Sequence, residues 1–241
     1  MKKEKKKQIL RIFLFAGTAI SLFFVPWILV WAWILPLPNT VQEQLDEGIG
    51  HGFDGMIVYV DEAGKPPAFY SAGWDDRDNK IPANPKSLFK IASISKLYVA
   101  VAITKLVKDK RLSLDETLAD YFPELVGRIE YAEKITLKMM VQHRSGIPNF
   151  TNNPAFWVDE QENSKKALEF AIDLPASFEP DNGYEYSNTN YLLLREILDK
   201  VLGYNHHQYI REEILIPLEL NNTFFSITEV DLDDVMSGYY V

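Results

Sequence analysis

The chain opens on its longest hydrophobic segment. Residues 12–35 form a run of 24 residues without a charge. At about 1.5 Å per residue, a helix of this length spans roughly 36 Å, enough to cross the hydrocarbon core of a bilayer. The pattern predicts a transmembrane anchor over residues 9–35. A cleaved signal peptide is the alternative, but its apolar region would be shorter and would end at a small-residue cleavage site, whereas Trp33 here leads almost directly to Pro36.

The residues around this segment predict its orientation. Residues 1–8 contain five lysines and form a basic tail, which favours a cytoplasmic N-terminus. Three tryptophans lie where an outer interfacial belt is expected, namely Trp27, Trp31 and Trp33. We therefore expect a single-pass protein of the cell membrane, with the domain after residue 35 extracellular.

After the anchor, the unbroken apolar run gives way to short periodic segments. Residues 36–52 are interpreted as a linker and a first helix, in which apolar residues recur at helical spacing. Residues 56–60 and 68–74 are β-branched and aromatic runs separated by a polar turn. This arrangement predicts a hairpin of an antiparallel sheet.

Beyond the hairpin, apolar residues recur at the spacing of an α-helix. Apolar residues recur at i, i+3, i+4 and i+7, at positions Ile94, Leu97, Tyr98 and Val101. This spacing predicts an amphipathic helix whose apolar stripe faces a core. Thr136 fits as the N-cap of a short helix that Gly146 and Pro148 close. Further helices are predicted over residues 164–172 and 192–202. Residues 53–241 are therefore predicted to form an α+β domain in which a hairpin precedes an all-helical subdomain.

Composition narrows the classes of partner and chemistry. Residues 36–241 carry 19 Lys/Arg and 33 Asp/Glu, a net charge of −14, so nucleic acid is not an expected partner. The chain has no cysteine, which excludes disulfide and thiol chemistry and a lipoprotein anchor. His206 and His207 are adjacent, while His51 and His143 stand alone, so neither a metal nor a cofactor is expected and His143 is interpreted as structural.

Two Ser-x-x-Lys pairs are the main chemical signal. Ser93 and Lys96, at the head of a predicted helix, lie on one helix face, where the amine and the hydroxyl can meet. A serine is a weak nucleophile until a base removes its proton, and a lysine held neutral can be that base. Ser87 and Lys90 have the same spacing, but Ser87 follows a Pro/Asn breaker cluster and lies on an irregular lead-in. Ser93 is therefore the predicted nucleophile.

A second group of residues precedes the predicted helix 192–202. Tyr186 offers a phenol that can move protons, and Asn188 offers an amide that can hold a substrate carbonyl or N–H. Aromatic residues and asparagines are also ordinary in turns. This segment alone therefore does not define a site.

Taken together, the motifs resemble those of one family. Five signatures occur in consistent order: Phe89-x-Ile91-Ala92-Ser93-x-Ser95-Lys96, then Leu112-x-Leu114-Asp115 with Tyr121-x-Pro123, then Gln142-His143-x-Ser145-Gly146-Ile147-Pro148, then Tyr186-Ser187-Asn188-Thr189-Asn190-Tyr191, and finally Ile216-Pro217-Leu218 with Asn222-Thr223. From about Phe53 onward, the chain resembles the serine β-lactamase-related superfamily, in the branch of class C β-lactamases, D-alanyl-D-alanine carboxypeptidases and esterases. The resemblance implies a β-lactamase/transpeptidase-like α+β fold, with an antiparallel sheet flanked by helices plus an all-helical subdomain.

The resemblance also implies roles for four residues. Ser93 would be acylated, and Lys96 and Tyr186 would shuttle protons to and from it. Asn188 would bind the amide of the substrate. The backbone N–H of Ser93 would supply half of an oxyanion hole, the element that usually contributes most to acyl transfer.

The chain departs from the family pattern at several places. Asp181 and Glu219 stand where glycine is usual, so a different backbone is expected there. The third motif of the family, Lys or His followed by Thr/Ser and Gly on an edge strand, does not follow Tyr186. Relatives continue with three more strands, the second oxyanion N–H and a C-terminal helix. We therefore expect an incomplete domain, in which the apolar face of the Ser93 helix is partly exposed.

Two classes of function stay open. One is a membrane-anchored extracellular serine hydrolase that forms an acyl-enzyme on Ser93 with β-lactam, D-alanyl peptide or ester substrates. The other is an inactive fragment or a non-catalytic cell-wall or β-lactam binding protein, because the third motif is absent. The expected partners are a small-molecule or cell-wall peptide substrate and, through residues 9–35, the membrane. The sequence does not determine the oligomeric state.

Overall fold

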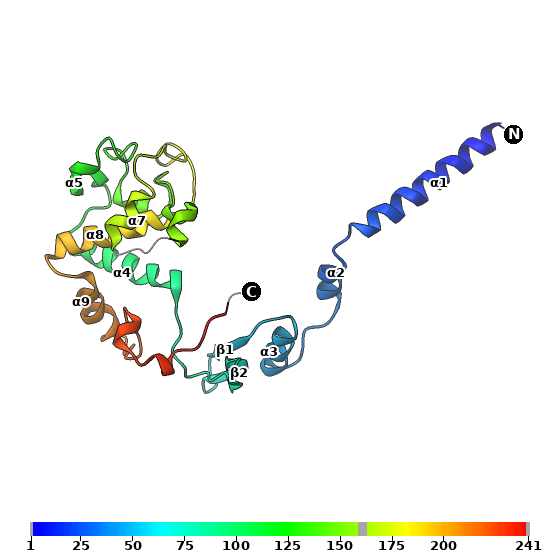
Figure 1. The fold of residues 1–241 in the computed structure, drawn as a ribbon, viewed down its shortest axis with the longest axis horizontal. Helices are drawn as coiled ribbons and strands as arrows, with labels where there is room; N and C mark the ends of the chain where they lie inside the picture. Colours follow the sequence, from blue (N-terminus) through cyan, green and yellow to red (C-terminus); the bar gives the residue numbers. More distant parts are fainter. Residues whose placement is uncertain (1, 159–162, 240–241) are drawn as a thin grey trace. The chain divides into compact units, whose positions relative to one another are not determined.

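A computed structural model describes residues 2–158 and 163–239 (Figure 1). These residues form two compact units, one of residues 2–87 with 236–239 and the other of residues 88–235. The domain predicted from residue 53 also runs through residues 159–162 and 240–241, which lie outside the described residues.

The predicted anchor consists of two helices rather than one, α1 (Lys2–Phe23) and α2 (Trp27–Ile34). Pro26 lies at the break because it has no N–H to donate to the carbonyl of Leu22, and the indole Nε1 of Trp27 donates to that carbonyl instead, at 3.0 Å. Within the described residues, no single helix is long and apolar enough to cross a membrane, and α1 and α2 meet the criterion only as a pair bent by 78°. The single predicted span is not found.

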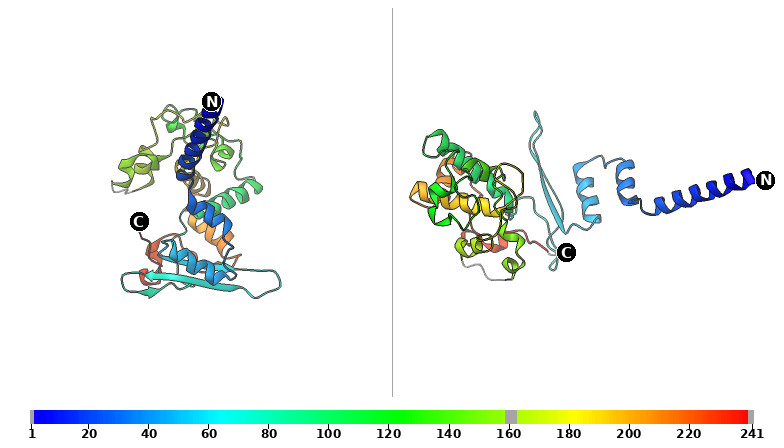
Figure 2. Two further views of the ribbon diagram at one scale, coloured as in Figure 1. Left: turned by 90° about the vertical axis from the view of Figure 1, so that its right-hand side faces the viewer. Right: turned by 90° about the horizontal axis from the view of Figure 1, so that it is seen from above.

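The predicted hairpin is present. Strands β1 (Gly55–Val60) and β2 (Ala68–Asp76) pair antiparallel, with Gly55 opposite Gly73 and Val60 opposite Ala68 (Figure 2). Gly73 has φ +75, and a Cβ there would lie 2.3 Å from the carbonyl oxygen of Asp54, so only glycine fits. A short third strand, β3 (Ile81–Pro82), pairs with β2 in a stretch predicted to be a turn-rich connection.

Helix α3 (Val41–Gly50) lies beside the hairpin and begins at a capping box. Thr40 Oγ1 accepts the N–H of Glu43 at 3.2 Å, and the Glu43 carboxylate accepts the N–H of Thr40 at 3.1 Å. The helix packs against β2 (Figure 1). The segment after residue 235 also returns to this unit, where the backbone N–H of Arg77 donates to the hydroxyl of Tyr239 at 2.6 Å.

The second unit is built from short helices, as predicted. In chain order these are η1 (Ala92–Ile94), α4 (Ser95–Lys108), α5 (Leu118–Tyr121), η2 (Pro123–Leu125), α6 (Leu137–Val141), η3 (Phe150–Asn152), η4 (Pro154–Trp157), α7 (Ser164–Glu169), α8 (Asn188–Leu202), α9 (His206–Ile210), η5 (Arg211–Leu215), η6 (Ile227–Glu229) and η7 (Leu232–Asp234). Between residues 203 and 239, all of them described, there is no strand beyond one isolated bridge between Val235 and Leu88.

The core of this unit lies between α4 and α8, which run side by side (Figures 1 and 2). Each helix contributes an apolar stripe at i, i+3 and i+4 or neighbouring positions, and burial of each such side chain contributes about 1.5–3 kcal/mol. The buried residues of the two helices include Val99, Ala102, Ile103 and Leu106 of α4 and Leu193, Leu194, Ile197 and Leu198 of α8.

The predicted core-facing stripe of the Ser93 helix is wrong for most of its residues. Tyr98 packs against the core, but Ile94, Leu97 and Val101 are 53%, 65% and 46% exposed. The helix carries a second stripe with the same spacing, from Val99 to Leu106, and that stripe is buried.

Helix ends differ from the prediction where tertiary contacts take over. Thr136 is confirmed as the N-cap of α6, since its Oγ1 accepts the N–H of Met139 at 3.3 Å. The helix ends at Val141 rather than at Gly146, because His143 adopts a left-handed conformation with φ +57. Helix α8 begins at Asn188, four residues before its predicted start, and α7 ends at Glu169, three residues before its predicted end.

Asp181 and Glu219, the two positions where glycine is usual, have backbone conformations that are uncommon for non-glycine residues. Asp181 has φ +69 and Glu219 has φ +56, so both residues adopt the left-handed conformation that glycine favours. Asp181 is additionally held by Arg144, whose Nε donates to its carboxylate at 2.5 Å and whose Nη2 donates to its carbonyl. Both positions therefore have a backbone conformation that glycine would adopt without strain.

Candidate active site

Ser93 lies in the middle of η1, immediately before α4. The N–H of Ile94 donates to the carbonyl of Ile91 at 3.0 Å, which closes a single tight turn before the α-helical ladder begins. Ala92, the residue before Ser93, has φ +45, an uncommon conformation for alanine that costs about 1–2 kcal/mol. Ser93 is exposed, so its hydroxyl is available to a ligand. The predicted position one turn from Lys96 is confirmed.

Three of the predicted residues meet around the Ser93 hydroxyl. Lys96 Nζ donates to Ser93 Oγ at 3.0 Å, and the Tyr186 hydroxyl lies 2.7 Å from the same oxygen. Lys96 reaches Ser93 along its own helix face, whereas Tyr186 comes from the segment that leads into α8. The packing of α8 against α4 therefore assembles the cluster from residues 93 positions apart.

The charge of Lys96 acts on the Tyr186 phenol. Lys96 Nζ lies 5.1 Å from the centre of the Tyr186 ring and 5.8 Å from that of Tyr191. Burial raises the pKa of the Tyr186 phenol, but hydrogen bonds with Lys96 and Ser93 and the charge of Lys96 lower it by more, so this pKa lies below its usual value. Burial is the main cause that raises the pKa of Tyr191, whose hydroxyl donates to the carbonyl of Val141 at 3.1 Å. Of the two phenols, Tyr186 is the one suited to accept a proton.

Asn188, the fourth predicted residue, is the first residue of α8, and both polar atoms of its side-chain amide form hydrogen bonds. Its Oδ1 accepts from the Tyr186 hydroxyl at 3.3 Å. Its Nδ2 donates to Asn149 Oδ1 at 3.3 Å and to Thr151 Oγ1 at 3.2 Å. This arrangement turns the amide oxygen toward the phenol. Asn149 and Thr151 were not singled out from the sequence, because nothing local marks a residue that contacts another one almost 40 positions away.

Two of the family signatures are joined by a buried polar network. Ser145 Oγ donates to Asn190 Oδ1 at 2.7 Å and also accepts the N–H of Ile147 at 3.1 Å. Thr189 Oγ1 donates to the carbonyl of Pro148 at 2.6 Å and accepts the N–H of Phe150 at 3.0 Å. Buried polar groups are stable only when they are paired. The network therefore holds the segment around residue 145 against the start of α8, which carries Asn188.

In the competing Ser-x-x-Lys pair, Ser87 has a different partner. The hydroxyl of Ser87 donates to the carboxylate of Asp75 at 3.4 Å. Lys90 is exposed, and the pair of Ser87 with Lys90 falls across the boundary between the two units. The choice of Ser93 over Ser87 as the candidate nucleophile stays a prediction.

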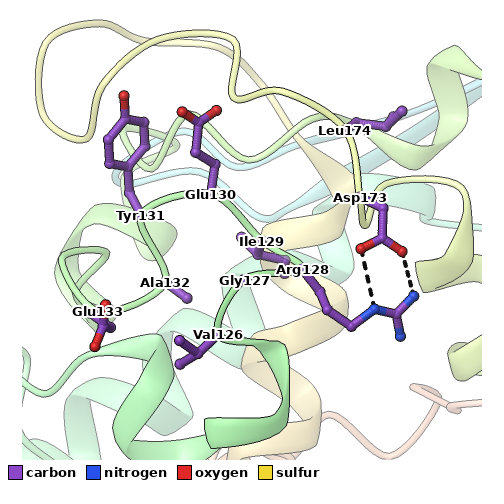
Figure 3. Close-up of a pocket in the computed structure, with 10 residues that line it drawn as sticks. All are labelled: Val126, Gly127, Arg128, Ile129, Glu130, Tyr131, Ala132, Glu133, Asp173 and Leu174. Carbon is purple, nitrogen blue, oxygen red and sulfur yellow. Dashed lines mark hydrogen bonds and ion pairs between the residues drawn. The ribbon is translucent and has the colours of Figure 1, made fainter.

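A pocket on the helical unit lies elsewhere (Figure 3). It is lined by the loop from Val126 to Glu133 together with Asp173 and Leu174. Figure 3 shows the guanidinium of Arg128 facing the carboxylate of Asp173, with distances of 2.5 Å from Nη2 to Oδ2 and 3.3 Å from Nε to Oδ1. None of the residues of the Ser93 cluster lines it. Both charged side chains are about half exposed, so the pair contributes little to stability.

The cluster as a whole is typical of a serine nucleophile that is activated by a lysine and a phenol. Residues 38–240 match the family model described as Beta-lactamase, and the chain belongs to this family of serine hydrolases. The fold prediction is confirmed as far as an antiparallel sheet and helices of the β-lactamase/transpeptidase type. The individual roles of Ser93, Lys96, Tyr186 and Asn188 stay predictions.

Three relatives illustrate the similarity. The chain is 28% identical to Protein flp of Staphylococcus aureus (strain MW2) over 211 aligned residues. The alignment covers 84% of this chain and 42% of Protein flp. Over 191 residues it is 27% identical to Penicillin-binding protein 4* of Bacillus subtilis (strain 168), covering 77% and 40%. The D-amino acid amidase of Ochrobactrum anthropi SV3, in complex with L-phenylalanine amide, has a similar structure, with a TM-score of 0.72, 28% identity, and coverage of 84% and 57%. The chain thus spans about half the length of the proteins it matches.

Proposed function

We propose that this protein is a serine hydrolase that forms an acyl-enzyme on Ser93. The observation that carries the proposal is the position of the Ser93 hydroxyl, 3.0 Å from Lys96 Nζ and 2.7 Å from the Tyr186 hydroxyl. A serine with two proton-transfer groups at hydrogen-bond distance is arranged for attack on a carbonyl carbon.

The geometry supports a division of roles. Tyr186, as the phenolate, takes the proton of Ser93 Oγ while that oxygen bonds to the carbonyl carbon of the substrate. The ammonium group of Lys96 stabilises the phenolate before the transfer. The proton then passes from Tyr186 to the leaving amine or alcohol as the tetrahedral intermediate collapses to the acyl-enzyme. The same phenolate then takes a proton from water, whose oxygen attacks the acyl carbon. As the ester bond to Ser93 Oγ breaks and the carboxylic acid leaves, Tyr186 returns this proton to Ser93 Oγ.

The substrate class rests on likeness to relatives. One relative is a D-amino acid amidase and another is a penicillin-binding protein, so a β-lactam, a D-alanyl peptide or an ester is the proposed substrate. Asn188 is the residue proposed to bind the amide of such a substrate, and its position beside the Tyr186 hydroxyl, at 3.3 Å, supports this role.

The test is labelling of the full chain with a fluorescent penicillin and with a fluorophosphonate, followed by digestion and identification of the modified peptide. We expect label on Ser93 and none in Ser93→Ala. Ser87→Ala is the matched control, because it removes the other Ser-x-x-Lys serine, and it is expected to label normally. Label on Ser87, or on neither serine with both probes, would overturn the proposal.

A second candidate is stoichiometric acylation or binding without turnover. This candidate keeps the same nucleophile, with Lys96 Nζ and the Tyr186 hydroxyl at hydrogen-bond distance from Ser93 Oγ, and differs only in whether the acyl-enzyme is hydrolysed. In this case Ser93 would still react with a penicillin, but hydrolysis of nitrocefin or p-nitrophenyl acetate would not exceed that of Ser93→Ala. Ser93-dependent turnover would exclude this candidate.

We also propose that α1 and α2 anchor the protein in the cell membrane, with the basic N-terminus in the cytoplasm and the domain outside. The support is the run of 24 uncharged residues after the lysine-rich tail. Protease added to intact cells is expected to remove the domain and leave the anchor with the membrane. A domain that survives protease would have the opposite orientation, and a domain released without protease would point to a cleaved signal peptide.

A further inference from the structure

His143 stands at a helix end where glycine is the usual residue. The N–H of His143 donates to the carbonyl of Met140 at 3.2 Å, and the N–H of Arg144 donates to that of Met139 at 2.8 Å. These two bonds form a Schellman motif at the end of α6, with His143 in its left-handed position at φ +57. A non-glycine residue here is disfavoured by about 1–2 kcal/mol.

The ring and backbone of His143 hold both sides of Tyr186. The carbonyl of His143 accepts the N–H of Glu185 at 3.1 Å, and its ring Nδ1 accepts the N–H of Ser187 at 3.1 Å. The residues immediately before and after Tyr186 are therefore both hydrogen-bonded to His143. In addition, the rings of His143 and Tyr186 lie with their centres 4.6 Å apart and their planes 33° apart.

The hydrogen bonds and charges around the His143 imidazole favour one neutral tautomer. Because Nδ1 accepts the Ser187 N–H, the ring proton belongs on Nε2. His143 is 9% exposed, and burial followed by the charge of Lys96 lowers its pKa below the usual value. The other titratable groups around the ring are phenols, with ring centres within 6.2 Å, and they are Tyr184, Tyr186 and Tyr191. A charged imidazole would place a second cation beside Lys96 and would lose the bond from Ser187.

We infer that His143 is a positioning residue of the active site, which holds the Tyr186 phenol against Ser93 through the neutral, Nε2-protonated imidazole. This inference rests on the proposed function, in which Tyr186 exchanges a proton with Ser93. His143 touches neither Ser93 nor the site of bond formation. It acts by fixing the backbone on both sides of Tyr186 and by contact with one face of its ring.

The helical unit offers a matched control. Helix α4 ends in the same motif, since the N–H of Lys110 donates to Val107 at 3.1 Å and that of Arg111 to Leu106 at 2.9 Å, and Lys110 has φ +58. Lys110 is exposed. His143→Gly and Lys110→Gly therefore make the same backbone change at equivalent positions, and only the first removes the ring beside Tyr186.

The test follows Tyr186 directly, by NMR titration of the full chain labelled with ¹³C at the tyrosine Cζ, with Tyr186→Phe to assign the resonance. We expect Tyr186 to titrate below the ordinary tyrosine range in the wild type and in Lys110→Gly, and to move up toward that range in His143→Gly. His143→Asn tolerates the left-handed conformation and can still accept the Ser187 N–H through Oδ1, so an intermediate titration is expected. An unchanged titration in folded His143→Gly would overturn the inference.

Two further readouts separate this inference from the proposed function. Long-range ¹H–¹⁵N spectra of the wild type should show the ring proton of His143 on Nε2, and a proton on Nδ1 would overturn the inference even if His143→Gly does not fold. The fluorophosphonate labelling rate of Ser93 should fall at least about tenfold in His143→Gly and stay unchanged in Lys110→Gly. If the wild type does not label at all, the proposed function fails, while the titration and the tautomer still decide the role of His143.

Discussion

Asn149 caps helix α8 from outside the helix, and its removal is expected to weaken both the fold and the site. The first N–H of α8, at Asn188, donates to Asn149 Oδ1 at 3.0 Å, while the N-cap residue Ser187 makes no side-chain cap bond. The same oxygen accepts from Asn188 Nδ2 at 3.3 Å and from the N–H of Thr151 at 3.4 Å. One side chain thus satisfies the helix end and orients the Asn188 amide.

The size of the effect follows from these bonds. Loss of an N-cap acceptor costs about 0.5–2 kcal/mol, and an unpaired, partly buried donor costs about 1–3 kcal/mol. The two costs overlap, because both describe the N–H of Asn188, so Asn149→Ala is expected to lower the free energy of unfolding by about 1–2 kcal/mol. With a urea m-value of about 1–3 kcal/mol per molar, the unfolding midpoint falls by about 0.3–2 M.

The assay is urea unfolding of the full chain followed by far-UV circular dichroism, together with the labelling rate of Ser93. Asn153→Ala is the matched control, because Asn153 Oδ1 accepts the N–H of Ala155, at 3.0 Å, at the exposed start of the short helix η4 and away from α8. Asn149→Asp keeps the acceptor and adds a negative charge at the helix N-terminus, so it should restore the midpoint. If Asn149→Ala has no larger effect than Asn153→Ala, or if Asn149→Asp is as damaging as Asn149→Ala, the capping argument is wrong.

Further predictions concern strain and proton transfer. Glu219→Gly is expected to raise the free energy of unfolding by about 0.5–1 kcal/mol in thermal unfolding, because it relieves a left-handed glutamate at φ +56 at some cost in chain entropy. Asp181→Gly should gain less, since it also loses the ion pair with Arg144, and equal gains would contradict this reasoning. Tyr186→Phe should slow acylation of Ser93 by about 100- to 10,000-fold in a mass-spectrometric time course, with no change in Tm. Because the pKa of Tyr186 lies below its usual value, the acylation rate should rise with pH as the phenolate forms and should level off below the pH at which a free phenol titrates. A rate that falls over this rise in pH would exclude the phenolate as the base.

The sequence by itself determined the features that depend on neighbours along the chain. The antiparallel hairpin follows from two β-branched runs and a polar turn, and the cap at Thr136 follows from residue type and position. The approach of Ser93 and Lys96 follows from their spacing on one helical turn. Each of these features is decided within a few residues, so periodicity and caps are sufficient to predict it.

Tertiary structure alone decided which surfaces and side chains meet. Helix α4 carries two apolar stripes of the same spacing, and packing against α8 buries the one from Val99 to Leu106, leaving Ile94 and its neighbours exposed. The positions of Asn149 and His143 against the start of α8 depend on contacts with residues about 40 positions away. No local pattern encodes such contacts, because each of them exists only after the helices have packed and the buried polar groups have found their partners.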